Sequence, residues 1–230
     1  MKRILSCTLL LVISFQFVSF SQVTLRTKIA QMLMCGFPGK SMPDTLFTDL
    51  NQRGLGGVLF FGYNIENPSQ LSGLTSQMKN AALIPPFIAI DQEGGKVARL
   101  NQNNGYQKTP TAQRLGTVLN NLDSTAYYAA LMAGWLKSAG INVNFAPVVD
   151  VNVNPNSPAI GALERSYSAS PVIVHNHART FVQKMTEKKV IPALKHFPGH
   201  GSAANDSHLG FTDISSSWSN NELIPYQDFI

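Results

Sequence analysis

Cysteine, charge and repetition are all scarce in this 230-residue chain. Only two cysteines occur, and Cys7 lies in the apolar stretch at the beginning, which leaves Cys35 as the one thiol of residues 22–230. An intrachain disulfide is therefore excluded for that part. Charged residues make up 13% of the chain and form no basic run, so nothing indicates nucleic-acid binding. No internal repeat, low-complexity tract or linker is present, which favours a single domain.

What the chain does have is apolar residues, at 44%, which suits a globular enzyme with a buried parallel sheet. The first apolar run, residues 4–20, follows the basic start Met1-Lys2-Arg3. This is the pattern of a secretory signal, and Ser19 and Ser21 supply small residues before a cleavage point. We expect residues 1–21 to be a signal peptide and the protein to be exported, periplasmic or secreted. The run is slightly short for a membrane span, and an uncleaved signal anchor is the alternative.

Short apolar runs alternate with amphipathic segments along the rest of the chain. The runs expected to form strands are residues 34–37, 57–61, 87–91, 141–151 and 190–194. The segments expected to be helical are residues 25–33, 43–52, 67–83, 124–139, 171–189 and 221–230. This alternation predicts right-handed crossovers and a parallel sheet, in either a barrel or a doubly wound arrangement. The fold class is α/β.

Polar residues follow three of the expected strands. Asp91 closes one strand and leads into residues 92–99, Asp150 closes the next, and Lys195 closes the last. In parallel α/β folds, ligands bind at the carboxyl edge of the sheet. The sequence therefore predicts a single pocket built from three separate loops.

The loop that begins at Lys195 is the richest in chemistry-bearing residues. Asp206 and His208 are two residues apart, so the carboxylate can orient the imidazole and make it a proton donor and acceptor near neutral pH. A metal site is an alternative, because His196, His200, Asp206 and His208 are all ligand types. The glycines and the lysine of the loop fit a sugar or phosphate pocket better.

The motif Lys-His-Phe-Pro-Gly-His-Gly at residues 195–201, followed by Asp-Ser-His at 206–208, resembles glycoside hydrolase family 3, in particular its β-N-acetylhexosaminidase branch. The resemblance implies a (β/α)8 TIM-barrel-like fold, and it implies no metal or organic cofactor. In that branch the histidine of the second motif is the general acid/base. The resemblance therefore assigns the role of general acid/base to His208, with Asp206 as the residue that supports it.

The same resemblance extends to the sugar contacts. Residues 91–99, Asp-Gln-Glu-Gly-Gly-Lys-Val-Ala-Arg, look like the family's segment that grips the terminal sugar. Asp91 would accept hydrogen bonds from ring hydroxyls and Arg99 would donate to them. Arg165, Lys195 and His196 match further sugar-binding positions. The alternatives are a salt bridge between Asp91 and Arg99 that closes their loop, and an Arg165 that is anchored structurally.

Two other acids compete for a catalytic role. We interpret Glu93 and Asp150 as structural residues, or as partners of the basic groups.

Two departures from the family pattern stand out: Lys96 occupies a position that more often holds arginine, and Leu163 and Glu164 lie in a segment that is usually tighter.

About five of the eight barrel strands can be counted. We expect residues 22–230 to be a partial catalytic domain with an open sheet edge and little activity of its own. The family's aspartate nucleophile lies on a later strand, and neither Asp213 nor Asp228 has its context. The expected parent activity is retaining removal of β-linked N-acetylglucosamine from the non-reducing end of glycans, including peptidoglycan fragments. The alternatives are a β-glucosidase-type member of the family, a non-catalytic carbohydrate-binding remnant and a metallohydrolase.

Overall fold

A five-stranded parallel sheet forms the centre of the computed structural model, which describes residues 23–227 and 229. The strand order is β1-β2-β3-β6-β7. The strands are β1 (Met34–Gly36), β2 (Gly57–Phe60), β3 (Phe87–Ile90), β6 (Val143–Asn144) and β7 (Ile191–Pro192). The predicted α/β class and parallel pairing are confirmed. Within the described residues β1 and β7 are the outer strands and do not meet, so the barrel is not closed.

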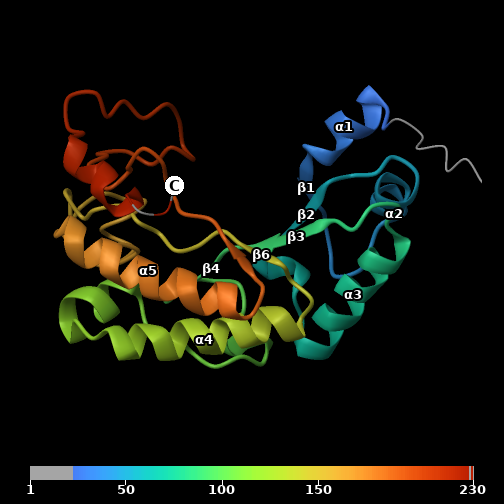
Figure 1. Ribbon diagram of the computed structural model, residues 1–230, viewed down its shortest axis with the longest axis horizontal. Helices are drawn as coiled ribbons and strands as arrows, with labels where there is room; N and C mark the ends of the chain where they lie inside the picture. Colours follow the sequence, from blue (N-terminus) through green and yellow to red (C-terminus); the bar gives the residue numbers. More distant parts are fainter. Residues whose placement is uncertain (1–22, 228, 230) are drawn as a thin grey trace, which may run out of the picture.

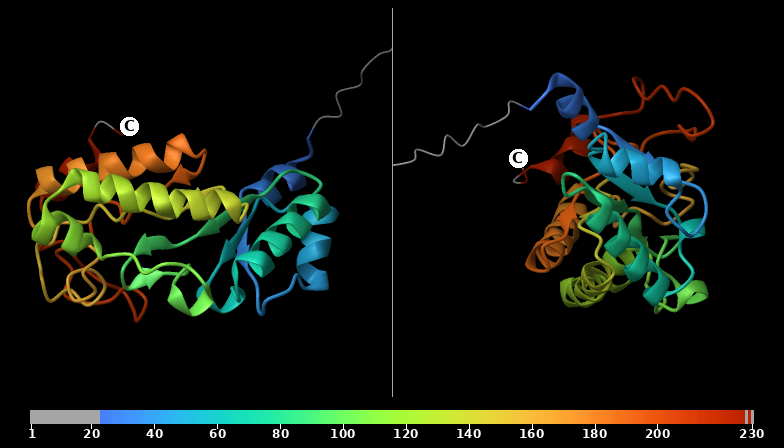
Figure 2. Two further views of the ribbon diagram at one scale, coloured as in Figure 1. Left: turned by 90° about the horizontal axis from the view of Figure 1, so that it is seen from below. Right: turned by 90° about the vertical axis from the view of Figure 1, so that its right-hand side faces the viewer.

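Helix α1 precedes β1, and the other helices lie in the connections between strands (Figure 1). They are α1 (Leu25–Gln31), α2 (Asp44–Asn51), α3 (Pro68–Ala81), α4 (Leu122–Ser138) and α5 (Pro171–Glu187). Asparagine side chains start two of them: Asn67 accepts from the backbone N–H of Gln70 at α3, and Asn121 accepts from that of Ser124 at α4. Helices α4 and α5 lie side by side (Figure 2). A buried hydrogen bond between Thr125 and His177 ties them together at 2.7 Å.

Single turns and an irregular helix complete the connections. The 3-10 turns are η1 (Gly62–Asn64), η2 (Gln102–Asn104) and η4 (Asn220–Tyr226), and residues Arg114–Leu119 form a π-helix, labelled η3. Among the described residues, no helix is both long and apolar enough to cross a membrane. The predicted signal peptide, residues 1–21, lies outside the described part of the chain.

The main core fills the space between the sheet and helices α2 to α5. Phe60 and Ile88 from the strands are fully buried, as are Met78 of α3, Leu136 of α4 and Met185 of α5. Burial of side chains of this size stabilises the fold by about 1.5–3 kcal/mol each. The apolar stripe predicted for residues 171–189 faces this core and a second cluster, as expected.

Three expected elements differ in length or type. The strand expected at 141–151 is only two residues long, and pairing resumes only at the isolated bridge between Val148 and Lys195. The strand expected at 190–194 is likewise reduced to Ile191–Pro192. The expected C-terminal helix is the 3-10 turn η4, which contains Pro225. The helix expected at 25–33 is present as α1, and none of its residues is buried.

An unpredicted hairpin follows β3. Its strands are β4 (Gln92–Gly94) and β5 (Val97–Ala98), and they pair in antiparallel fashion. Gly94 and Gly95 turn the chain with φ angles of 100° and 58°. A side chain at Gly95 would also collide with Thr111, whose Cα lies 2.7 Å from the position that a Cβ would occupy. The hairpin places Glu93 on the same edge of the sheet as Asp91.

Candidate active site

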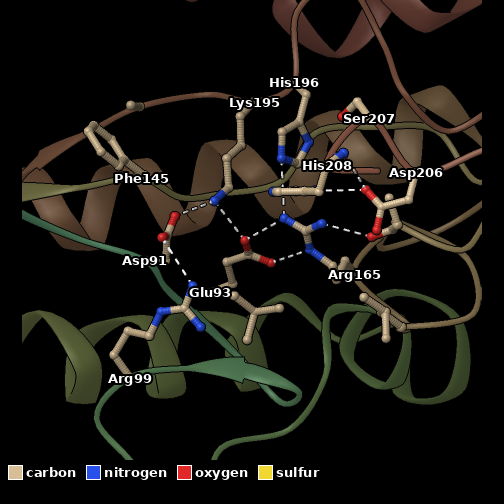
Figure 3. A pocket seen from close by; sticks show the side chains of 14 residues that line it. Asp91, Glu93, Arg99, Phe145, Arg165, Lys195, His196, Asp206, Ser207 and His208 are labelled. Carbon is tan, nitrogen blue, oxygen red and sulfur yellow. Dashed lines mark hydrogen bonds and ion pairs between the residues drawn. The ribbon is translucent and has the colours of Figure 1, made fainter. Parts of the chain in front are cut away.

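The pocket lies where β3, β6 and β7 end, as the sequence predicts. Asp91 directly follows β3, Glu93 stands on β4, and Lys195 and His196 follow β7. Lys195 is held there by a parallel bridge to Val148, beyond β6. The pocket has a volume of about 590 Å³. Its lining consists of Asp91, Glu93, Val97, Arg99, Phe145, Ala159, Leu163, Arg165, Ala193, Lys195, His196, Asp206, Ser207 and His208 (Figure 3).

Lys195 links two carboxylates. Its Nζ lies 2.8 Å from Asp91 Oδ1 and 2.7 Å from Glu93 Oε1 (Figure 3). Asp91 also pairs with Arg99, whose Nη2 lies 3.3 Å from Oδ2. Burial raises the pKa of Asp91, but the Lys195 ammonium and the Arg99 guanidinium outweigh it and hold that pKa below its usual value. Asp91 is therefore an ionised hydrogen-bond acceptor at the pocket wall.

Arg165 is held from two sides. Its Nε and Nη2 donate to the two oxygens of Glu93, both at 2.8 Å, and its Nη1 donates to the carbonyl of Ala159 at 2.7 Å. The Arg165 and Glu93 side chains are only 10% and 6% exposed. Burial lowers the pKa of Arg165, yet hydrogen bonding and charge attraction from Glu93 and the neighbouring aspartates reverse this and raise it. The guanidinium is a fixed donor group at the pocket floor.

His196 lies between Asp150 and Arg165. Its Nδ1 is 2.6 Å from Asp150 Oδ2, and its Nε2 is 3.2 Å from Arg165 Nη2. Asp150 is fully buried, and its Oδ1 accepts from the backbone N–H groups of His196 and His200. Gly201 lets this loop close over the carbonyl of Val151, which leaves no room for a Cβ.

Asp206 and His208 form the exposed side of the pocket. Asp206 Oδ1 accepts from the His208 backbone N–H at 2.9 Å and lies 2.7 Å from His208 Nδ1. The backbone hydrogen bond and the imidazole contact hold the pKa of Asp206 below its usual value. The His208 side chain is 79% exposed, so its ring is open to a ligand. In Figure 3 this pair lies on the other side of Lys195 from Asp91 and Arg99.

All seven residues predicted for the site line this one pocket. The expected alternative of an Asp91–Arg99 salt bridge is also present, and it faces the pocket. Glu93 and Asp150 are partners of basic groups, as interpreted from the sequence. In residues 23–227 and 229, no three histidine, cysteine, aspartate or glutamate side chains are arranged to hold a metal ion.

Besides Glu93, which was interpreted as a partner of basic groups, six lining residues were not predicted. Phe145 directly follows β6. It could have been predicted, because residues that follow the strands of a parallel sheet lie at the edge where the pocket forms. Leu163 was noted only as a departure from the family pattern. The others, Val97, Ala159, Ala193 and Ser207, are small or apolar and give no signal of their own in the sequence.

A parallel α/β domain with ion-paired donors and acceptors at the carboxyl edge of its sheet is typical of an enzyme that binds a polar small molecule. Residues 24–230 match the protein family described as "Glycosyl hydrolase family 3 N terminal domain". The chain therefore belongs to glycosyl hydrolase family 3.

Two curated relatives are each 37% identical to this chain. One is named Beta-hexosaminidase A, from Pseudoalteromonas piscicida; the match covers 83% of this chain and 33% of that protein. The other is named Beta-hexosaminidase, from Tolumonas auensis; it covers 76% of this chain and 52% of that protein. The chain thus spans between a third and about half of the length of these relatives.

Solved structures show the same arrangement. A glycoside hydrolase family 3 β-N-acetylglucosaminidase from Paenibacillus sp. superposes with a TM-score of 0.82 at 32% identity, over 89% of this chain and 39% of that one. NagZ from Neisseria gonorrhoeae, in complex with N-trifluoroacetyl-D-glucosamine, gives a TM-score of 0.76 at 27% identity, over 84% and 58%. These similarities account for the five parallel strands as part of a TIM-barrel-like domain.

Proposed function

We propose that this chain is the sugar-binding and proton-transferring part of a retaining glycoside hydrolase that removes β-linked N-acetylglucosamine from the non-reducing end of glycans. The observation that carries the proposal is the convergence of seven residues from three separate loops on one pocket. The names of the relatives favour the N-acetyl sugar over the glucose of a β-glucosidase-type enzyme. Peptidoglycan fragments are the proposed source of the sugar.

The sugar-binding wall supplies complementary groups. Asp91 offers carboxylate oxygens, while Arg99, Arg165 and Lys195 offer N–H donors. A pyranose presents a fan of hydroxyl groups that both donate and accept, so fixed charged partners orient it. His196 completes this wall.

His208 is the proposed general acid/base. Its ring is exposed to the pocket and its Nδ1 is engaged by Asp206, which leaves Nε2 for the glycosidic oxygen. In the first step His208 donates a proton to the leaving oxygen, and in the second it removes one from water. No metal or organic cofactor takes part in this scheme.

A retaining mechanism also needs a nucleophile. The carboxylates that line the pocket have partners: Asp91 and Glu93 pair with cations, and Asp206 with His208. The resemblance to the family implies an aspartate nucleophile on a later strand, so we propose that the nucleophile lies outside these 230 residues and that residues 22–230 are one part of the catalytic domain. Residues 1–21 are proposed to be a signal peptide that directs the protein out of the cytoplasm.

Two measurements test the function. Isothermal titration of the 230-residue chain with N-acetylglucosamine reports binding, with glucose as the control sugar. Release of nitrophenol from a nitrophenyl β-N-acetylglucosaminide, by the chain extended with its own downstream reading frame, reports turnover. Binding without turnover in the extended protein would favour a carbohydrate-binding role instead. Turnover that prefers the nitrophenyl β-glucoside would favour the β-glucosidase-type alternative.

A further inference from the structure

The contacts of His196 determine which ring nitrogen carries the proton. Arg165 Nη2 lies 3.2 Å from His196 Nε2. A guanidinium has only donors, so Nε2 must accept at this contact. Three other hydrogen bonds orient Arg165, because Glu93 accepts from two of its nitrogens and the Ala159 carbonyl accepts from the third.

The proton therefore resides on Nδ1. Nδ1 lies 2.6 Å from Asp150 Oδ2, and it donates to that oxygen. The other oxygen of Asp150 accepts from the backbone N–H groups of His196 and His200, at 3.2 and 2.8 Å. The fully buried carboxylate thus has three donors and a fixed orientation.

We propose that Asp150 is a positioning residue that holds His196 in its Nδ1–H tautomer, so that Nε2 presents a lone pair to the sugar. Arg165 can give up its contact with Nε2, because three other hydrogen bonds hold it. The sugar group that meets Nε2 must then be a donor. A hydroxyl meets this demand, whereas a fluorine or an ether oxygen does not. The part of this inference that concerns the sugar rests on the proposed function.

Replacement of Asp150 by asparagine reverses the tautomer without a change of size. The two backbone N–H groups keep the amide oxygen at the position of Oδ1, so the amide NH₂ takes the place of Oδ2 and faces Nδ1. Nδ1 must now accept from the amide, so the proton moves to Nε2. The contact of Nε2 with Arg165 is then lost, because at 3.2 Å it is the longer of the two contacts of the ring and Arg165 keeps its other hydrogen bonds. The variant therefore exchanges an acceptor for a donor at one point of the pocket wall.

The experiment is nitrogen-15 NMR of the histidine-labelled 230-residue chain, with the His196 signals assigned by their loss in H196Q. In the wild type, Nδ1 should give the signal of a protonated nitrogen and Nε2 that of an unprotonated one. D150N should exchange the two. S166A is the control, because Ser166 is buried and donates to the backbone carbonyl of Asp150 without contact to its carboxylate. S166A should keep the wild-type pattern.

Titrations with N-acetylglucosamine and its singly deoxyfluorinated analogues give a second readout. In the wild type, fluorine at the position that meets Nε2 should weaken binding by roughly tenfold or more, and D150N should reduce that penalty. A wild-type ring protonated on Nε2 overturns the proposal whether or not D150N folds, and so does an unchanged tautomer in D150N. An equal fluorine penalty in both proteins overturns the sugar-donor requirement. Absence of any sugar binding refutes the proposed function but leaves the NMR result to decide the tautomer.

Discussion

Glu93→Gln should destabilise the protein more than any change at an exposed ion pair. Glu93 pairs with Arg165 through two hydrogen bonds and with Lys195 at 2.7 Å, and its side chain is only 6% exposed. Glutamine keeps the shape but removes the charge. Among the residues that the structure describes, Arg165, 10% exposed, then has no carboxylate within ion-pair distance, whereas Lys195 keeps Asp91.

The expected loss follows from that burial. Removal of one partner of a buried ion pair costs about 3 kcal/mol of the free energy of unfolding. For a domain of this size, that corresponds to a decrease in Tm of roughly 6–12 °C. Asp49→Asn is the matched control, since Asp49 pairs with Arg53 at the surface and such a pair contributes about 0.3–0.5 kcal/mol. The assay is urea unfolding monitored by circular dichroism. If E93Q and D49N shift the urea midpoint equally, the ion pairs of Glu93 with Arg165 and Lys195 do not stabilise the pocket wall.

Three further predictions concern acid stability, sugar affinity and the core. The pKa of Asp91 is depressed, so its contribution to stability is present above its unfolded pKa of about 3.8 and is lost as the pH falls through its lower folded value. D91N should therefore lose less stability than the wild type between neutral pH and pH of about 3, measured by urea unfolding; parallel losses would contradict this. R99A should weaken N-acetylglucosamine binding by roughly tenfold in calorimetry, because one charged donor is removed; unchanged affinity would place Arg99 outside the sugar site. F181A should lower the free energy of unfolding by about 3–5 kcal/mol, since this ring is 2% exposed in the main core; a loss below 1 kcal/mol would mean that the cavity collapses.

The strand and helix pattern was predictable because its signals are local. Runs such as residues 57–61 and 87–90 are continuous and apolar, which a strand buried on both faces requires. The helix at 171–189 shows a clear apolar stripe, and its start at Pro171 is marked by a proline in the first turn. These features depend on a few neighbours in sequence, so they can be read without knowledge of the fold.

What could not be predicted depends on distant contacts. The β4–β5 hairpin reads as a loop in the sequence, because two glycines interrupt it and its strands are three and two residues long. The exposed stripe of α1 cannot be told from a core stripe by periodicity alone. Likewise, Asp150 is identifiable as a strand-end acid, but its contact with His196 depends on residues 46 positions apart.

The same distinction holds for the site. Asp91 and Lys195 are visible in sequence because they follow predicted strands, whereas the roles of the other predicted site residues are implied by motifs that resemble the family. The pairing of Arg165 with Glu93 joins residues 72 positions apart, so only the fold reveals it. That pairing in turn determines which atoms of Arg165 and His196 face the pocket.

The most direct test of the account is the leaving-group dependence of His208→Ala in the chain extended by its downstream reading frame. If His208 donates the proton to the leaving oxygen, kcat/KM should fall by roughly 10²–10⁴-fold for a natural N-acetylglucosaminyl glycoside. It should change little for a dinitrophenyl glycoside, whose leaving group needs no proton. An equal loss on both substrates, or no loss on either, would contradict the assignment of His208 as the acid.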